Sequence, residues 1–205
     1  LTCIPRSLGT HDGSFHADEM TACALLLLKN KIDKNRIFRT RDLGKISLCE
    51  YVCDVGGEYE PEKKRFDHHQ ASYKGSLSSA GMVLEYLRNK SDLSNREYEF
   101  LNNMLVRGVD AHDNGKEMQM PGVCTFSHII SNFTPISYEA TPEEQDECFF
   151  SALDFTVGHL DRLLQRFAYA QSCQDEVKAA MSLYHDCLIF DRIIPWMETF
   201  FENDG

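Results

Sequence analysis

Short strand-like segments alternate with helix-like segments over the first half of this chain, and this alternation constrains the fold more than any other feature. Strand patterns are predicted at residues 6–10, 36–41, 50–57 and 64–69. Helical patterns occupy residues 15–30 and 79–89, with a single helical turn at 43–48, and Ser78 and Ser79 offer an N-cap for the last full helix. Strands separated by helices pair in parallel, so the predicted fold class is α/β, a parallel sheet flanked by helices.

The second half of the chain is predicted to be mainly helical. Residues 95–110 are amphipathic, and a longer helical stretch covers residues 142–185. Apolar residues recur at helical spacing in that stretch, which indicates core packing rather than a cofactor site: Phe149, Leu153, Val157, Leu160, Leu164 and Phe167. Residues 187–191 are predicted to be a strand. We therefore expect a metal-binding α/β domain at 1–115, a helical extension and connector at 116–185, and the start of an incomplete C-terminal domain at 186–205.

Charge and cysteine content narrow the functional class. The formal net charge of -11 argues against broad, non-specific binding of nucleic acid, although it leaves room for a local basic channel or a metal site. None of the eight cysteines forms a C-x-x-C pair, which favours reduced thiols and a cytoplasmic location. No signal peptide is expected at the N-terminus. The longest apolar run, residues 22–28, is too short to span a bilayer, so no membrane association is expected.

Histidines and aspartates gather in four clusters, most of them where a predicted strand ends. Five of the eight histidines belong to these clusters. The candidate residues are His11, His16 and Asp18 in the first cluster, Asp54 in the second, Asp67, His68 and His69 in the third, and Asp110, His112 and Asp113 in the fourth. Because the carboxyl ends of parallel strands share one edge, these side chains are expected to meet in one pocket. Structural roles stay open for Asp54, as a turn cap beside Gly56 and Gly57, and for Asp110, as a helix cap.

This mixture of imidazole and carboxylate favours a metal centre over a covalent nucleophile. Such ligands suit Mn2+, Fe2+, Co2+ or Zn2+. One carboxylate that bridges two ions sets up two-metal catalysis, which lowers the pKa of a bound water and neutralises phosphoryl charge. Ser14 lies in H-D-G-S-F, which is not a nucleophile elbow, and no Gly-rich nucleotide-binding loop is present. The remaining histidines, His128, His159 and His185, are predicted to be core or surface residues, and His112 is predicted not to be a ligand.

The order of the four clusters resembles that of the DHH phosphoesterase superfamily, in which a histidine and two spaced aspartates precede a strand-end aspartate, a D-H-H triplet and a further aspartate. The chain differs in having His16 where that superfamily has a carboxylate. Longer segments are similar to the melanocyte-proliferating-gene family of metal-dependent hydrolases: T-H-D-G-S-F-H-A-D-E, V-C-D-V-G-G-E-Y, R-F-D-H-H-Q, L-S-S-A-G and V-D-A-H-D-N-G. Members of that family continue well past the length of this chain, so a fragmentary form is expected.

The resemblance implies a dinuclear site of two divalent ions, most simply Mn2+. It implies that His11 and His16 hold one ion, that Asp18, His68 and Asp110 hold the other, and that Asp54 bridges them. His69 would contact substrate phosphate or donate a proton, so that His69 and Asp54 form the catalytic pair. Asp67 would orient the neighbouring imidazole by contacting it, and Asp113 would likewise contact a ligand and not an ion. Arg39 and Arg41 are candidate phosphate contacts, with a solvated strand edge as the alternative.

The implied function is a divalent-metal phosphodiesterase, a 3′–5′ exonuclease acting on RNA or short oligonucleotides. Three alternatives remain open. The same metals would serve a small-molecule phosphatase or pyrophosphatase, which an acidic chain suits. The site could also be retained without activity in a metal- or nucleotide-binding module, or the clusters could form a polar network without metal. The sequence does not predict the oligomeric state.

Overall fold

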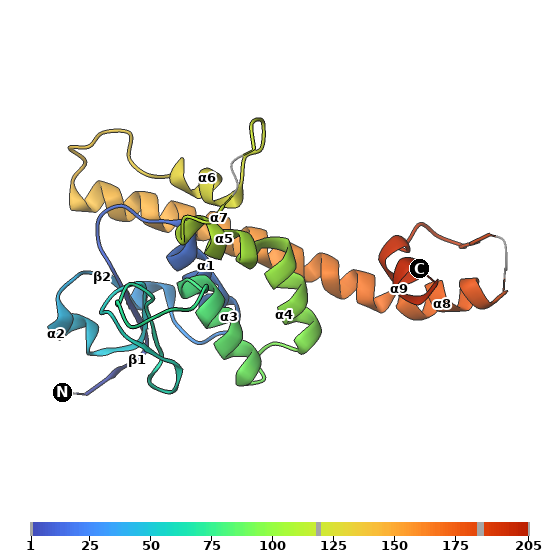
Figure 1. Cartoon of the computed structure of the whole chain (residues 1–205), viewed down its shortest axis with the longest axis horizontal. Helices are drawn as coiled ribbons and strands as arrows, with labels where there is room; N and C mark the ends of the chain where they lie inside the picture. Colours follow the sequence, from blue (N-terminus) through green and yellow to red (C-terminus); the bar gives the residue numbers. More distant parts are fainter. Residues whose placement is uncertain (1, 118–119, 184–186, 205) are drawn as a thin grey trace. The chain divides into compact units, whose positions relative to one another are not determined.

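The computed structural model describes residues 2–117, 120–183 and 187–204 of the chain (Figure 1). The chain divides into two compact units, Leu1–Leu160 and Asp161–Gly205. The unit boundary lies inside a long helix, and each unit is described by itself below. The domain boundaries expected near residues 115 and 185 remain predictions, and residue 185 is outside the described residues.

A five-stranded sheet forms the centre of the first unit. Its strands lie in the spatial order β2 (Ile37–Arg39), β1 (Ile4–Thr10), β3 (Cys49–Cys53), β5 (Arg65–Phe66) and β4 (Tyr59–Glu60). The pairs β1–β2, β1–β3 and β3–β5 are parallel, and β4 is antiparallel to β5. The predicted α/β fold is confirmed, and the structure adds one strand that was not predicted, β4. Strand β4 has two residues, which is too short to produce a readable alternation in sequence.

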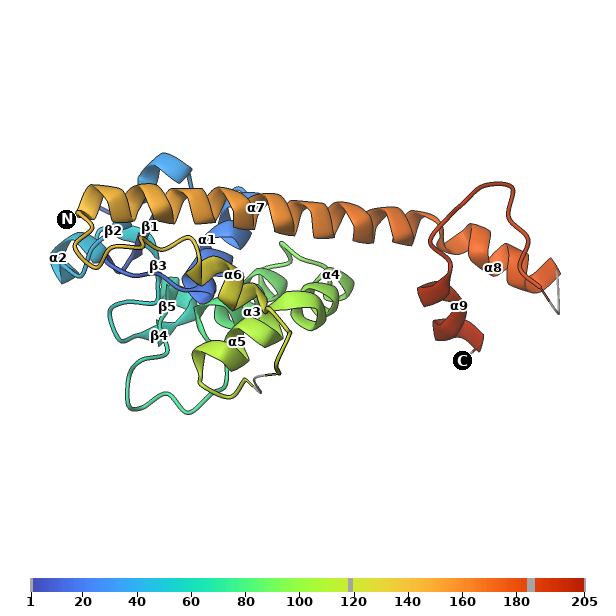
Figure 2. The ribbon, with the colours of Figure 1, turned by 90° about the horizontal axis from the view of Figure 1, so that it is seen from above.

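Helices cover both faces of the sheet because β3 sends alternate side chains to opposite sides. Tyr51 packs edge-on against Tyr86 of α3 (Ser79–Asn89), with ring centroids 6.2 Å apart. Val52 joins an apolar cluster with Ile46 of the short helix α2 (Leu43–Ile46). Helix α1 (Ala17–Leu28) packs alongside α3 (Figure 2). Gly9 in β1 allows the close approach of α2, since a Cβ there would lie 3.1 Å from Ile46 Cδ1.

The rest of the first unit is helical. It contains the 3-10 turns η1 (Lys34–Arg36) and η2 (Pro61–Lys63), helix α4 (Asn95–Leu101), the π turn η3 (Asn102–Val106), and helices α5 (Arg107–Asp113) and α6 (Phe126–Ser131). The first part of α7 (Pro142–Ser172) completes it. The predicted stripe on α7 is buried at Phe149, Leu153 and Leu160, and Phe149 meets Phe15 with ring centroids 5.7 Å apart. Packing therefore accounts for this part of the stripe.

The second unit contains the end of α7, helix α8 (Gln174–Leu183) and helix α9 (Met197–Asp204). Its small core consists of Cys173, Val177 and Ile194, with Met181, Phe190 and Trp196 packed against them. The strand predicted at residues 187–191 is wrong, because these residues have no regular secondary structure. Phe190 of this segment packs against the small core, and no strand lies in the described part of the second unit. No helix of the described chain is both long and apolar enough to cross a membrane.

Candidate metal centre

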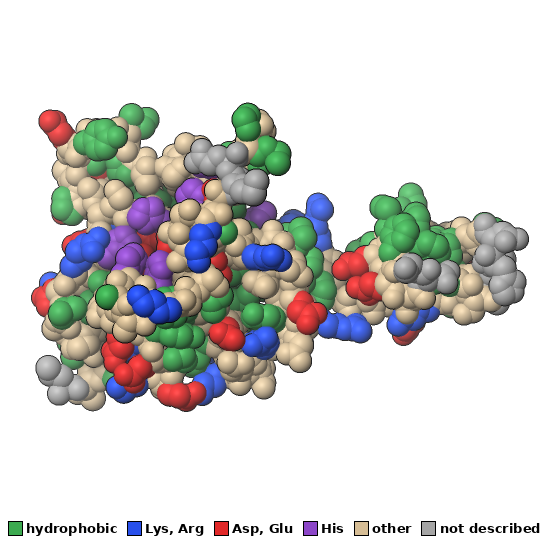
Figure 3. All heavy atoms as spheres, viewed as in Figure 1, with side chains coloured by type: hydrophobic (Ala, Val, Ile, Leu, Met, Phe, Trp, Pro, Cys, Tyr) green, Lys and Arg blue, Asp and Glu red, His purple; other side chains and the backbone are tan. Residues whose placement is uncertain are grey.

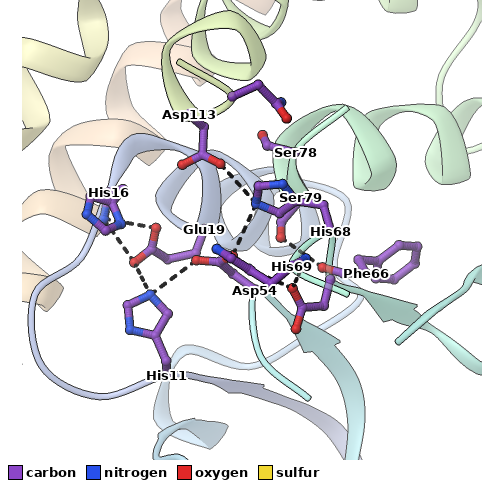
Figure 4. Close-up of polar contacts among 12 residues, drawn as sticks. His11, His16, Glu19, Asp54, Phe66, His68, His69, Ser78, Ser79 and Asp113 are labelled. Atoms are coloured by element: carbon purple, nitrogen blue, oxygen red, sulfur yellow. Dashed lines mark hydrogen bonds and ion pairs between the residues drawn. The ribbon is translucent and has the colours of Figure 1, made fainter. Parts of the chain in front are cut away.

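Three strands end at the edge of the sheet where the predicted site lies. His11 follows β1, Asp54 follows β3, and the triplet Asp67–His69 follows β5. Because these strands are parallel neighbours, their carboxyl ends bring the three segments together, as the close-up shows (Figure 4). The histidines also gather on one face of the first unit, beside acidic side chains (Figure 3). The structure thus places residues from distant parts of the chain in a single location.

Asp54 lies at the centre of this location. Its Oδ2 is 3.1 Å from His11 Nε2, and its Oδ1 is 3.2 Å from His69 Nδ1 and 3.5 Å from His68 Nε2. The residue is 5% exposed and has a left-handed backbone with φ of 56°. Aspartate tolerates this conformation better than most residues, but it is still a strained one. Burial raises the pKa of Asp54, and its contacts with the three imidazoles outweigh burial and lower it.

The N-terminus of α1 contributes the second part of the site. His16 is the N-cap residue, and its backbone N–H donates to both carboxylate oxygens of Glu19, at 2.9 Å each. Glu19 Oε1 also lies 3.1 Å from His11 Nε2, so Glu19 fixes both the helix start and the His11 ring. Sequence analysis did not select Glu19 as a site residue. Glu19 lies three residues after the N-cap, where a glutamate commonly completes a capping box. This position is the sequence signal that could have identified Glu19.

Asp18, also on α1, is fully buried and has no hydrogen bond in the described structure to either carboxylate oxygen. Burial raises its pKa well above the usual value, and the neighbouring Asp54, Glu19 and Asp113 raise it further. A buried carboxylate without a hydrogen-bond partner is costly unless a cation compensates it. Asp54 Oδ1 is also buried without a hydrogen bond of good geometry, although His69 Nδ1 lies 3.2 Å from it. Both observations fit residues that are built to hold cations.

The D-H-H triplet separates into different environments. Asp67 is 2% exposed and accepts the backbone N–H groups of Gly57, at 2.6 Å, and of His69, at 3.0 Å. Its Oδ1 is also 2.8 Å from His69 Nδ1. The His69 side chain is 63% exposed, whereas that of His68 is 8% exposed. Asp67 therefore fixes His69 at the open side of the site, and His68 lies inside it.

The two aspartates of α5 have different partners. Asp113 Oδ2 is 2.9 Å from His68 Nε2. Asp110 Oδ1 instead accepts from Ser78 N–H at 2.9 Å, Ser78 Oγ–H at 2.7 Å and Gly81 N–H at 3.1 Å. Asp110 therefore caps the N-terminus of α3 and belongs to no described group with metal-compatible spacing. The ligand role expected of Asp110 stays a prediction, and the geometry favours Asp113 for it.

The predicted arginines also differ. The Arg39 side chain is 2% exposed, pairs with Asp146 of α7 at 2.5 Å and lies over the Phe149 ring at 4.4 Å. It also donates to the Gly13 carbonyl, so it joins the β1–α1 loop to α7 rather than facing solvent. Arg41 is 67% exposed and pairs with Asp12 at 3.3 Å. Arg41 lines a pocket of about 540 Å3 together with Gly13, Ser14, Val55, Gly56, Asp12, His11, His16, Asp54, Asp67 and His69.

Neighbouring carboxylates raise the pKa values of His11, His68 and His69. Burial lowers the pKa of His11, but Asp54 and Glu19 outweigh it and raise the value to about 10. Burial likewise lowers the pKa of His68, and Asp113 and Asp54 raise it to about 10. For His69 the main cause is Asp54, which raises the pKa to about 9 against burial. The carboxylates thus create a local negative field at this end of an acidic chain.

Three sets of ligand atoms at this edge lie within 4.8 Å of one another, which is suitable spacing for metal ions. They are His11, His16, Glu19 and Asp54; Asp54, His68 and His69; and His16, Asp18 and Asp113. Asp54 and His16 each occur in two sets, so the three sets join into one continuous group of candidate metal ligands. His159, predicted not to be a ligand, stacks on Phe126 at 5.4 Å. His185 is outside the described residues.

Comparison with known proteins identifies the family. The family model MYG1_exonuc, described as "Uncharacterised protein family (UPF0160)", matches residues 7–204. A "MYG1 protein" of Chlamydia trachomatis is 54% identical over 202 residues, which cover 98% of this chain and 69% of that relative. This chain belongs to the MYG1 family. The family resemblance predicted from the sequence motifs is confirmed.

The names of more distant members of the family state an activity. The "MYG1 exonuclease" proteins of rat and human are 32% and 31% identical to this chain over 197 residues, which cover 82% of it. The chain spans 51% of the length of each of these mammalian proteins. No solved structure matches the chain.

Proposed function

We propose that this chain carries a dinuclear divalent-metal site and hydrolyses phosphodiester bonds, as an exonuclease of 3′–5′ direction acting on RNA or short oligonucleotides. The observation that carries the proposal is the convergence of four histidines and several buried carboxylates from three strand ends and two helices, with Asp18 left without a hydrogen-bond partner. The mammalian relatives are named exonucleases, which supports a nucleic acid as the substrate class. Mn2+ suits this mixed set of imidazole and carboxylate ligands.

The proposed ligands divide around Asp54, which would contact both ions. His11 and His16 would hold one ion with Asp54. Asp18, His68 and Asp113 would hold the other, with Asp113 taking the role that the family resemblance gave to Asp110. Two ions in such a site supply charge neutralisation at the phosphoryl group and a nucleophile that is active at neutral pH.

The chain's own residues would bind and orient the phosphodiester. The His69 side chain is exposed and is held by Asp67 at 2.8 Å, so its ring is positioned to contact a phosphate oxygen or to donate a proton to the leaving oxygen. Arg41 lies on the rim of the same pocket and can pair with a second phosphate oxygen. Glu19 keeps the His11 ring in place through its contact at 3.1 Å.

A small-molecule phosphatase or pyrophosphatase is the second candidate. Arg41 is the one lysine or arginine among the described residues that line the pocket, and the formal net charge is -11. A site with so little positive charge suits short substrates better than long polyanions, whose binding depends on many phosphate contacts. The two candidates share the same ions and ligands and differ in the substrate that turns over.

The test is a substrate panel with the purified chain and Mn2+: a labelled RNA oligonucleotide ladder, pyrophosphate and nucleoside monophosphates. Stepwise shortening of the ladder from its 3′ end supports the proposal, and preferential release of phosphate from the small substrates supports the second candidate. Asp54→Asn should abolish turnover. The matched control is Asp154→Asn, which changes an exposed aspartate that pairs with Lys34. Bound metal without turnover of any substrate would indicate an inactive metal-binding module.

A further inference from the structure

A second group of histidines lies outside the candidate dinuclear site. His112 on α5, Glu117 in the following loop and His128 on α6 each present one ligand atom within 4.8 Å of the other two. None of these three residues belongs to the sets around Asp54. Sequence analysis predicted that His112 is not a ligand and that His128 is a core or surface residue, and the two are 16 positions apart in the chain. The fold of α5 and α6 brings them together.

The contacts within this group suit a single cation. His112 Nδ1 lies 2.5 Å from Glu117 Oε2, and the Glu117 side chain is 15% exposed. The rings of His112 and His128 meet edge-on, with centroids 5.4 Å apart. Two ligand atoms on one tetrahedral zinc ion are about 3.4 Å apart when each bond is about 2.1 Å long. To admit an ion, the His112–Glu117 contact of 2.5 Å widens by about 0.9 Å, and the ligand atom of His128, which lies within 4.8 Å of the other two, completes the set.

One ring nitrogen of His128 already has a partner, which leaves the other for a metal. Thr125, the N-cap residue of α6, contacts His128 Nδ1 twice: its backbone N–H donates to this nitrogen at 3.3 Å, and its hydroxyl oxygen lies 3.0 Å away. An ion on Nε2 moves the ring proton to Nδ1, which then donates to the hydroxyl in place of accepting from the backbone N–H. Metal-binding histidines are commonly held in this way by an acceptor on the opposite nitrogen.

Space for a further ligand is present beside the group. A pocket of about 340 Å3 is lined by Glu117, Thr125 and His128, together with apolar and backbone groups of residues 120–123. Three protein ligands with an open fourth position are typical of zinc sites that keep a water or bind a ligand. Imidazole and carboxylate together also exclude the soft-metal alternatives that need thiolate.

We propose that His112, Glu117 and His128 form a third, mononuclear site for a transition-metal ion of the Zn2+ type, independent of the dinuclear centre. A bound ion ties α5, α6 and the loop between them at one point. His112 is the neighbour of Asp113, so the ion also braces the helix that presents Asp113 to His68. The chain therefore binds three ions, two around Asp54 and one here.

Cobalt provides the test, because Co2+ in a tetrahedral site absorbs visible light much more strongly than Co2+ in an octahedral site. Co2+ titrations of the full chain are compared with those of Glu117→Gln, His128→Gln and Asp54→Asn. We expect one equivalent of tetrahedral Co2+ in the wild type and in Asp54→Asn, and a loss of at least about 100-fold in the affinity of this equivalent in the other two variants. Zn2+ should displace it.

Controls separate this result from unfolding and from the proposed function. Glu139→Gln changes an exposed glutamate outside every metal-compatible group among the described residues and should leave the titration unchanged. Circular dichroism checks that each variant is folded. An unchanged tetrahedral signal in folded Glu117→Gln and His128→Gln, or no such signal in the wild type, overturns the proposal. Because Asp54→Asn should keep the signal while losing turnover, the two proposals fail independently.

Discussion

The two histidine groups of the first unit are built on different kinds of support. Around Asp54, the side chains extend from the ends of β1, β3 and β5 and from the start of α1, so the sheet fixes their spacing. Around His128, they come from two helices of six and seven residues and the loop between them. A strand-end site follows from sheet topology, whereas a helix-and-loop site depends on how the helices pack. This difference explains why the first group could be predicted from sequence and the second could not.

The comparison is sharpest at α5, which supplies residues to both groups. Asp113→Asn should lower Mn2+ affinity and turnover by more than about 100-fold, because it removes a proposed ligand carboxylate next to His68. Loss of a residue that only hydrogen-bonds to a metal ligand already lowers affinity or activity by about 10–100-fold. Asp110→Asn should instead lower the free energy of unfolding by about 1–3 kcal/mol, because it weakens the three hydrogen bonds at the start of α3. Calorimetric Mn2+ titration and urea unfolding measure the two effects.

The reverse result would restore the assignment drawn from the family resemblance. If Asp110→Asn abolished metal binding in a folded protein and Asp113→Asn did not, Asp110 would be the ligand and its capping contacts would be secondary. Asp113→Asn is matched to Asp110→Asn because both change one carboxylate of the same helix to an amide of the same size.

The sequence predicts positions that depend on one strand and leaves open those that depend on packing. Asp54 and His68 lie in segments that are predicted as strands, residues 50–57 and 64–69, so their convergence could be expected. Asp110 and Asp113 lie three residues apart on one helix and face the same side, so spacing alone could not decide which of them reaches the metals. Arg39 was a candidate phosphate contact in the sequence, but in the structure it pairs with Asp146, which is 107 residues away in the chain. That distance hides the pair from any local pattern.

Metal binding should stabilise the first unit. Mn2+ at 100 times its dissociation constant raises the free energy of unfolding by about 2.7 kcal/mol for each ion that binds the folded state alone. We therefore expect a higher Tm with Mn2+ than with a chelator in the wild type and a much smaller difference in Asp54→Asn. Differential scanning calorimetry measures both. Equal Tm values with and without Mn2+ in the wild type would favour the polar network without metal.

The start of α3 offers a test that separates support from ligation. A Cβ at Gly81 would lie 2.3 Å from Asp110 Oδ2, and Asp110 cannot retreat without losing its hydrogen bonds to Ser78. Gly81→Ala should therefore destabilise the folded chain by about 1–3 kcal/mol, although alanine is a better helix former. Urea unfolding checks this value. Gly158→Ala is the matched control, since a Cβ there meets nothing within 4 Å. A neutral effect of Gly81→Ala would show that the contact with Asp110 is loose.

The smallest effect is expected at the pocket rim, where two arginines of one segment differ in exposure. Arg41→Ala should raise KM for an oligonucleotide by a few fold with little change in kcat, because an exposed cation contributes modestly and equally to substrate and transition state. Arg39→Ala should leave KM unchanged and destabilise the chain, since it leaves Asp146 unpaired and uncovers the Phe149 ring. Steady-state kinetics and thermal unfolding of both variants resolve the two roles. An increase in KM for Arg39→Ala that exceeds the one for Arg41→Ala would mean that substrate entry opens the β1–α1 loop and exposes Arg39.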